Sequence, residues 1–279
     1  MIIKQQGNKS KNMHILEKIV ASKQHEVMQL KKSFPVPELE KSRYFPEPVR
    51  SLKSSVLDRE KNGIIAEFKR QSPSRGVINS LACPAEVCRA YIDSGASAVS
   101  VLTDSEFFGG RNTDLIKVKE NCNGPVLRKE FIIDEYQVVE SKSIGADAIL
   151  LIVDILSKDE LRNLSLLASS LGLEVLFEIH DGEGIEKLPP EAAIIGINSR
   201  NLDSFRINRE LPVNVINRLP EESVRIAESG IRSVRDLVNL RIAGFDGFLI
   251  GERFMKSPDP GASCRKFIRE IATINNEQV

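Results

Sequence analysis

The 279-residue chain contains no tryptophan, and aromatic residues make up only 5% of it. Proteins that hold single-stranded nucleic acid by stacking bases on aromatic rings need more of these residues, so the composition argues against this class. The formal net charge is zero, because 39 basic residues balance 39 acidic ones. That balance argues against general electrostatic binding to nucleic acid or to an acidic membrane surface.

Cysteine is scarce, and the spacing of the four cysteines is uninformative. None belongs to a CxxC pair, and none has partner histidines at the spacing of metal ligands, so we predict no metal site. We expect free thiols in a reduced, cytoplasmic protein. The chain also lacks an apolar run of membrane-spanning length, and its first residues are not followed by the apolar core of a signal peptide. The cysteines are Cys83, Cys88, Cys122 and Cys264.

Short apolar segments alternate with longer amphipathic ones over most of the chain. Nearly continuous apolar strands separated by helices indicate a parallel sheet that helices cover. Eight such units in about 220 residues predict an α/β fold, a single (β/α)8 TIM barrel spanning residues 1–279. Strands are expected from residue 64 and over 98–102, 125–128, 148–153, 174–179, 193–198, 224–228 and 247–251. Helices are expected over 84–94, 112–121, 134–143, 157–171, 208–218, 233–242 and 258–274, with a short one before the sixth strand.

Residues 1–61 are expected to form an N-terminal helical extension. The segment 11–32 carries apolar residues at helical spacing, which predicts an amphipathic helix. We expect this helix to cover the amino-terminal end of the barrel; a lid or a dimer contact is the alternative. A proline-rich, irregular stretch over 34–48 and a short helix within 49–61 should follow.

Polar residues gather where the predicted strands end, which is where barrels of this type place their sites. Glu67 and Lys69 come first, and the period of two along a strand directs both to the same side of the sheet. Charges inside a barrel are costly unless they are paired or used. The fourth strand is the exception and should supply mainly apolar wall. Other strand-end groups are Thr103, Asp104, Lys129, Glu130, Glu178, His180, Asn198, Arg200 and Glu228.

Small residues follow the last two strands, in Ser229-Gly230 and Gly251-Glu252. Barrels commonly bind phosphate at this place with backbone N–H groups, and glycine permits close approach of the backbone. Lys69 and Ser72 from the adjacent first strand could complete such a site. We therefore expect a phosphate-bearing ligand, although these glycines could simply form turns.

Motifs in the same order along the chain resemble those of the indole-3-glycerol phosphate synthase family. They comprise 65–70 with 72–74, 101–104 with Phe108, 126–129 with 131–134, 196–202, 227–231 and 249–252. The resemblance covers nearly the whole chain and implies the same barrel fold. It also implies an enzyme of tryptophan biosynthesis, a carboxy-lyase without a cofactor. Its substrate would be 1-(2-carboxyphenylamino)-1-deoxyribulose 5-phosphate, and its products indole-3-glycerol phosphate, CO₂ and water.

The resemblance implies roles for individual residues. Lys129 would be the general acid of ring closure, and Glu178 the acid/base group of the later dehydration. Lys69 would bind the substrate carboxylate, Glu67 would hold the lysine network, and Asn198 would contact the reacting region. The residues implied in binding are Ser72, Ser229, Gly230, Gly251 and Glu252 at the phosphate, Phe108, Phe131 and Leu249 around the aromatic ring, and Arg200 and Glu228 elsewhere on the substrate.

Two positions depart from the family pattern. Glu130 stands where the family usually has aspartate, and its extra length could alter the surroundings of Lys129. Cys83 precedes Pro84 where a polar residue is more usual, which should cost only a little helix capping. The partner implied is a phosphorylated small molecule, and the chain could be a monomer or a homodimer.

Two other readings stay open at this point. A phosphoribosylanthranilate isomerase would want a cysteine base at the end of the first strand, where this chain has Glu67 and Lys69. A non-catalytic barrel that binds a phosphate ligand could keep the glycine loops. It would have no need of Lys129 and Glu178 together.

Overall fold

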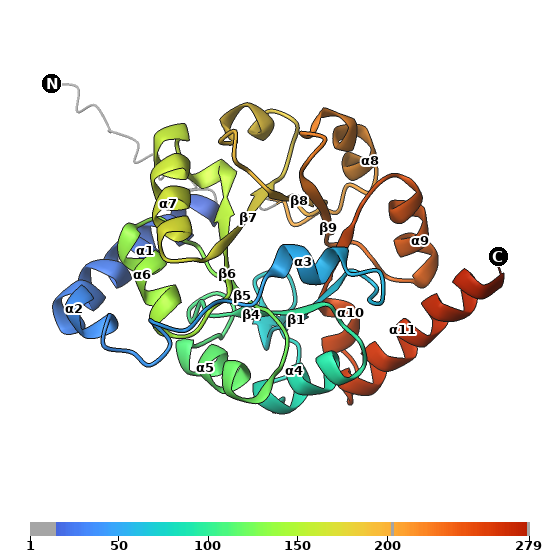
Figure 1. The fold of residues 1–279 in the computed structure, drawn as a ribbon, viewed down its shortest axis with the longest axis horizontal. Helices are drawn as coiled ribbons and strands as arrows, with labels where there is room; N and C mark the ends of the chain where they lie inside the picture. The colour runs from blue at the N-terminus through green and yellow to red at the C-terminus, as the bar shows by residue number, and fades with distance from the viewer. Residues whose placement is uncertain (1–14, 202–203, 278–279) are drawn as a thin grey trace, which may run out of the picture.

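The structure is a computed structural model that describes residues 15–201 and 204–277. Eight parallel strands close into a barrel in the order β1-β10-β9-β8-β7-β6-β5-β4, which confirms the predicted (β/α)8 fold (Figure 1). The strands are β1 (Ile64–Phe68), β4 (Ala98–Leu102), β5 (Val126–Lys129), β6 (Ala148–Ile152), β7 (Glu174–Ile179), β8 (Ile194–Asn198), β9 (Val224–Glu228) and β10 (Gly247–Ile250). A short antiparallel hairpin, β2 (Gln71–Ser72) with β3 (Gly76–Val77), forms where the sequence predicted only a loop.

Helices form an outer ring around the strands (Figure 1). Local sequence explains where several begin: Ser157 and Ser233 make capping boxes, and Pro84 occupies a first helical turn. Cys83 caps its helix without a side-chain hydrogen bond, as expected. The helices are α4 (Pro84–Asp93), α5 (Asn112–Asn121), α6 (Glu135–Ser143), α7 (Lys158–Ser170), α8 (Leu211–Val215), α9 (Val234–Ile242), α10 (Glu252–Met255) and α11 (Pro260–Glu277), with 3-10 turns η1 (Val153–Ile155), η2 (Gly184–Lys187) and η3 (Ile216–Arg218).

Two predicted helices differ in extent, and two short helices form where none was predicted. The one expected over 208–218 consists of the short α8 followed by η3. The last one begins later than expected, and the unpredicted α10 precedes it. Within the stretch predicted to be irregular, α2 (Val36–Leu39) forms because Pro37 falls in its first turn, where proline is tolerated.

Alternation along the strands separates two apolar layers. In β1, Ile64, Ala66 and Phe68 belong to the layer between barrel and helices, whereas Ile65 packs with the residues that fill the barrel interior. Because side chains alternate, Glu67 shares the interior side with Ile65. The sequence predicted that Glu67 and Lys69 lie on the same side of the sheet. The ion pair between the two side chains confirms this.

The amino-terminal end of the barrel is closed by α3 (Leu52–Leu57), which lies across the ring of strands in Figure 1. Leu52 and Val56 are buried with the interior residues, and the Ser55 hydroxyl donates to the carbonyl of Ser97 over 2.6 Å. Ser97 directly precedes β4, so these contacts lie at the amino ends of the strands.

The N-terminal helix α1 (Ile15–Ser33) lies at the opposite, carboxyl end, so the expectation that it covers the amino end is wrong. Ile19 packs near Phe107 and Phe108, which follow β4, and Ser22 hydrogen-bonds Glu106 in the same loop. The physical reason is that α3 already fills the amino end. Residues 11–14 of the predicted helix, and residue 202 of one family-like motif, lie outside the described residues.

Other expectations about the chain concern its thiols and its hydropathy. All four cysteines are free, and Cys88, Cys122 and Cys264 are buried. None of the described helices combines the length and the hydropathy that a membrane-spanning helix needs.

Candidate active site

A cavity of about 710 Å³ lies at the carboxyl ends of the strands. The sequence analysis picked out fifteen residues for the site, and every one of them lines this cavity. Leu150 and Ile152 of β6 add apolar wall, as predicted. The fifteen are Glu67, Lys69, Ser72, Phe108, Lys129, Phe131, Glu178, Asn198, Arg200, Glu228, Ser229, Gly230, Leu249, Gly251 and Glu252.

Lys129, the last residue of β5, reaches two carboxyl groups across the barrel. Its Nζ hydrogen-bonds Glu178 of β7 and lies 3.0 Å from Oε2 of Glu228 on β9. Burial opposes the charge on Lys129, but the Coulombic attraction of Glu178, Glu228 and Glu67 outweighs it and raises the pKa of the lysine. The side chain is 11% exposed, so a protonated ammonium faces the cavity.

The two carboxyl groups beside Lys129 differ in their affinity for a proton. Burial, and then the charge of Glu178, raise the pKa of Glu228 to about 8. Burial also opposes the charge of Glu178, but Lys129 and His180 outweigh it and lower the pKa of that group. At neutral pH the pair therefore holds one proton, on Glu228, and one negative charge, on Glu178.

Gly196 of β8 makes room for Glu228. A Cβ added at this glycine would lie 2.1 Å from Glu228 Oε1, which is far closer than real contacts allow. Any larger residue at 196 would displace the carboxyl from Lys129. The sequence analysis gave Gly196 no role, since nothing local to it indicates what crosses the barrel toward it.

His180 and Asp154 extend the charged cluster away from the cavity. His180 Nδ1 lies 2.8 Å from Asp154 Oδ2, and Nε2 lies 3.1 Å from Glu178 Oε1. Burial opposes the charged imidazole, but Asp154 and Glu178 outweigh it and raise the pKa of His180 to about 10. The sequence analysis noted His180 without a role and missed Asp154, which lies in η1 after a strand that reads as apolar wall.

At the carboxyl end of β1, Lys69 Nζ lies 2.5 Å from Glu67 Oε1. Gly251 gives this carboxylate its space, because a Cβ there would lie 2.4 Å from Glu67 Oε1. Gly251 therefore acts on the charged pair of the neighbouring strand as well as on the loop it begins.

The loop after β9 bends sharply at two consecutive residues. Ser229 has φ 64° and Gly230 has φ 76°, both in the left-handed region. Such a conformation is strained for serine and is found preferentially at functional sites. A Cβ at Gly230 would also press on Ile207 at 3.0 Å.

Three cations surround the carboxylate of Glu252 at the start of α10. It lies 3.2 Å from Arg75, 3.1 Å from Arg200 and 2.6 Å from Lys256. Arg200 is oriented in turn by Asn198, whose Oδ1 accepts the Arg200 backbone N–H over 3.0 Å. This side of the cavity is therefore rich in positive charge, and Lys256 is a member that sequence reasoning missed.

Phe108 and Phe131 form an aromatic wall on the side of β4 and β5. Their ring centroids lie 5.9 Å apart at an interplanar angle of 37°. Glu130, which directly follows Lys129, also lines the cavity, and the partners of its carboxylate are Thr103, Lys23 and the Phe131 backbone N–H. The expected effect of its length on the surroundings of Lys129 is therefore not found in these contacts.

The closed barrel and its charged cavity define the class of (β/α)8-barrel proteins. The crystal structure of 3-hexulose-6-phosphate synthase from Salmonella typhimurium superposes with a TM-score of 0.59, covering 76% of this chain and 99% of that one. At 13% sequence identity this likeness concerns the fold alone.

Sequence comparison identifies the family. The model of indole-3-glycerol phosphate synthase matches residues 16–267. The protein named indole-3-glycerol phosphate synthase from Bacteroides thetaiotaomicron is 42% identical over 257 residues, covering 92% of this chain and 98% of the relative. The chain belongs to the indole-3-glycerol phosphate synthase family.

Proposed function

We propose that this chain closes the indole ring of 1-(2-carboxyphenylamino)-1-deoxyribulose 5-phosphate, with release of CO₂ and water, to give indole-3-glycerol phosphate. The observation that carries the proposal is the cluster of Lys129, Glu178 and Glu228 beside the rings of Phe108 and Phe131. Membership of the family supports the same reaction.

Lys129 is the general acid of ring closure in this proposal. Attack of the aromatic carbon on the ketone places negative charge on the ketone oxygen, and an ammonium can neutralise it by donating a proton. The surrounding carboxylates keep Lys129 protonated when substrate binds, which the role requires.

Glu178 is the base of the dehydration. Loss of CO₂ first restores the aromatic ring. Loss of water then requires a base that takes one proton from the intermediate and an acid that protonates the leaving hydroxyl, and a protonated lysine of the cavity can be that acid. Glu178 is ionised in its resting state and therefore can accept that proton. Glu228, protonated beside it, keeps the net charge of the pair at minus one, which limits repulsion in a buried site.

Lys69 binds the substrate carboxylate, and Glu67 holds the ammonium in place over 2.5 Å. The phosphate lies against Ser72, Ser229, Gly230 and Gly251, where backbone N–H groups can approach it. The cations around Glu252 add the positive charge that a phosphate favours.

The test mixes the purified protein with the substrate and follows indole fluorescence together with CO₂ release. Equal amounts of both products support the synthase. Turnover of phosphoribosylanthranilate without CO₂ release would point to the isomerase instead. Tight binding of phosphorylated ligands without any turnover would point to a non-catalytic barrel.

A further inference from the structure

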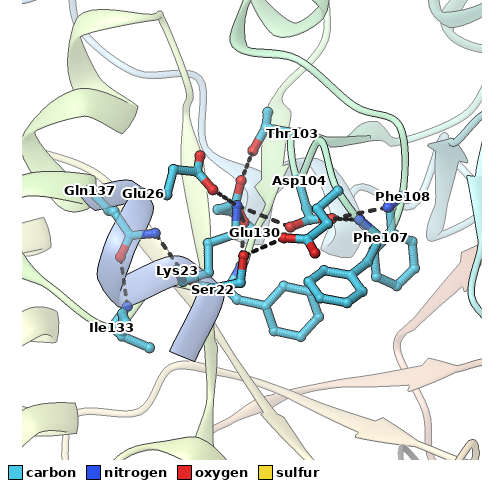
Figure 2. Close-up of polar contacts among 12 residues, drawn as sticks. Ser22, Lys23, Glu26, Thr103, Asp104, Phe107, Phe108, Glu130, Ile133 and Gln137 are labelled. Atoms are coloured by element: carbon cyan, nitrogen blue, oxygen red, sulfur yellow. Dashed lines mark hydrogen bonds and ion pairs between the residues drawn. The ribbon is translucent and has the colours of Figure 1, made fainter. Parts of the chain in front are cut away.

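Another buried lysine, Lys23 of α1, lies outside the cluster proposed for catalysis. Figure 2 shows its side chain pointing from the helix between the loops that follow β4 and β5. Its Nζ lies 3.0 Å from Asp104 Oδ2, 3.1 Å from Glu130 Oε1 and 2.7 Å from Glu26 Oε2. The side chain is only 1% exposed, so the helix has placed a charge where only paired charges are tolerated.

The carboxylates that hold Lys23 also hold the backbone of the aromatic wall. Asp104 Oδ1 accepts the N–H of Phe107 over 2.7 Å and that of Phe108 over 3.0 Å, while Oδ2 faces Lys23 (Figure 2). Glu130 Oε1 accepts the N–H of Phe131 over 2.8 Å, and the same oxygen faces Lys23. One ammonium therefore joins the two loops that carry Phe108 and Phe131.

The remaining contacts stiffen this connection. Glu130 Oε2 accepts from Thr103 Oγ1 over 2.6 Å, which fixes the carboxylate from the β4 side. Gln137 donates to the carbonyl of Phe131 and accepts from the N–H of Ile133, both over 2.9 Å, which fixes the loop after β5. A displacement of Lys23 should therefore move the two loops together with the rings of Phe108 and Phe131.

We infer that Lys23 is a positioning residue that sets the spacing of Phe108 and Phe131, and through them the affinity for the aromatic half of the ligand. The inference rests on the proposed function for the identity of that ligand. The phosphate half should be unaffected, because the loops with Gly230 and Gly251 follow β9 and β10, which pair with neither β4 nor β5.

The test compares Lys23→Met with the wild type in the full chain. Methionine keeps the length of the side chain and removes its charge. Two ligands are titrated: indole-3-glycerol phosphate, which carries both halves, and inorganic phosphate, which carries only one. Because a misplacement of about 1 Å can cost about 10²-fold in rate, we expect kcat/KM to fall at least about tenfold. Affinity for indole-3-glycerol phosphate should fall about as much, while that for phosphate should stay within roughly twofold.

Lys31→Met is the matched control. Lys31 also tethers α1 to the loop after β5, through Asp134 over 2.8 Å, but both partners are partly exposed and neither touches the aromatic wall. This variant should bind both ligands as the wild type does. A general loosening of the helix would instead affect Lys31→Met and Lys23→Met alike.

Asp104→Asn is the second variant, in case Lys23→Met does not fold. Asparagine keeps the oxygen that accepts from Phe107 and Phe108 and neutralises the group that faces Lys23. It should show the same preferential loss of the aromatic ligand. Equal loss of both ligands, or unchanged affinity for indole-3-glycerol phosphate in a folded variant, would overturn the inference.

A crystallographic readout separates this inference from the proposed function. The ring centroids of Phe108 and Phe131, 5.9 Å apart here, should shift in Lys23→Met crystals and stay in place in Lys31→Met crystals. Unmoved rings would refute the positioning role whatever ligand the cavity takes. If the rings move in Lys23→Met but the wild type does not bind indole-3-glycerol phosphate, only the proposed function would be refuted.

Discussion

Lys23 and Lys129 are both buried lysines among carboxyl groups, and they differ in what they can reach. In each, burial opposes the charge, and the surrounding carboxylates outweigh it and raise the pKa. Lys129 is 11% exposed and lines the cavity, whereas Lys23 is 1% exposed and does not. The same electrostatics therefore yields an ammonium that a ligand can reach at Lys129 and an ammonium enclosed by protein at Lys23.

The carboxyl groups around the two lysines differ as well. Around Lys129, Glu228 has a pKa raised to about 8 and keeps a proton at neutral pH. Around Lys23, burial also opposes the charge of Glu130, but Lys23, Arg128 and the hydrogen bonds from Thr103 and Phe131 outweigh it and lower the pKa. The carboxyl groups beside the two lysines are therefore shifted in opposite directions at Glu228 and Glu130.

Replacing Lys129 with methionine should produce the largest change in activity. The proposed general acid would be lost, and kcat should fall by about 10²–10⁴-fold, the usual contribution of acid–base catalysis. KM should change less, because ring and phosphate contacts lie elsewhere. Steady-state indole fluorescence measures both constants. Near-normal kcat in this variant would make Lys69 the leading candidate for the acid.

Replacing Lys23 with methionine should produce the largest change in stability. Asp104 and Glu130 would stay buried without their cation, which for a broken buried pair costs about 3–5 kcal/mol. Urea denaturation should show this as a lower free energy of unfolding. A loss below about 1 kcal/mol would mean that the carboxylates find other partners or take up protons.

The imidazole of His180 should make stability depend on pH. Its pKa is about 10 in the folded chain against an ordinary value of 6.5, so its stabilisation is complete below about 6.5 and disappears as pH rises through about 10. In His180→Asn this contribution should be missing. The difference in unfolding free energy between wild type and variant should therefore shrink across that range, and a constant difference would contradict the assignment.

Replacing Lys31 with methionine should have the smallest effect. Its ion pair with Asp134 is solvent-exposed on both sides. Exposed pairs of this kind contribute about 0.2–1 kcal/mol, and added salt should erase the difference. A salt titration of the melting temperature checks this and calibrates the Lys23 result against a tether on the same helix.

The sequence predicted the barrel well because each unit carries its own signals. The apolar run of β6 and the capping serine of α7 can be recognised without knowing what packs on them. The position of α1 could not be predicted in this way. Its apolar stripe fits either end of a barrel, and the deciding contacts of Lys23 are with Asp104 and Glu130, far away in the sequence.

The same limit applies to the site. Strand-end position revealed Lys129 and Glu178, since their place in the chain is enough to bring them to the cavity. Asp154 and Gly196 were missed because their roles depend on His180 and Glu228, which reach them from other strands. Which side chains meet across a barrel depends on the register between its strands. The periodicity along a single strand does not reveal this register.

The contacts of α1 determine when this helix can dock during synthesis of the chain. Glu130 is added 107 residues after Lys23, counting from 23 to 130, which at about 5–20 residues per second takes about 5–20 s. Until then α1 lacks one of the carboxylates that pair with Lys23 in the folded chain. The helix α1 can therefore complete its contacts at the carboxyl end of the barrel only after β4 and β5 have been made.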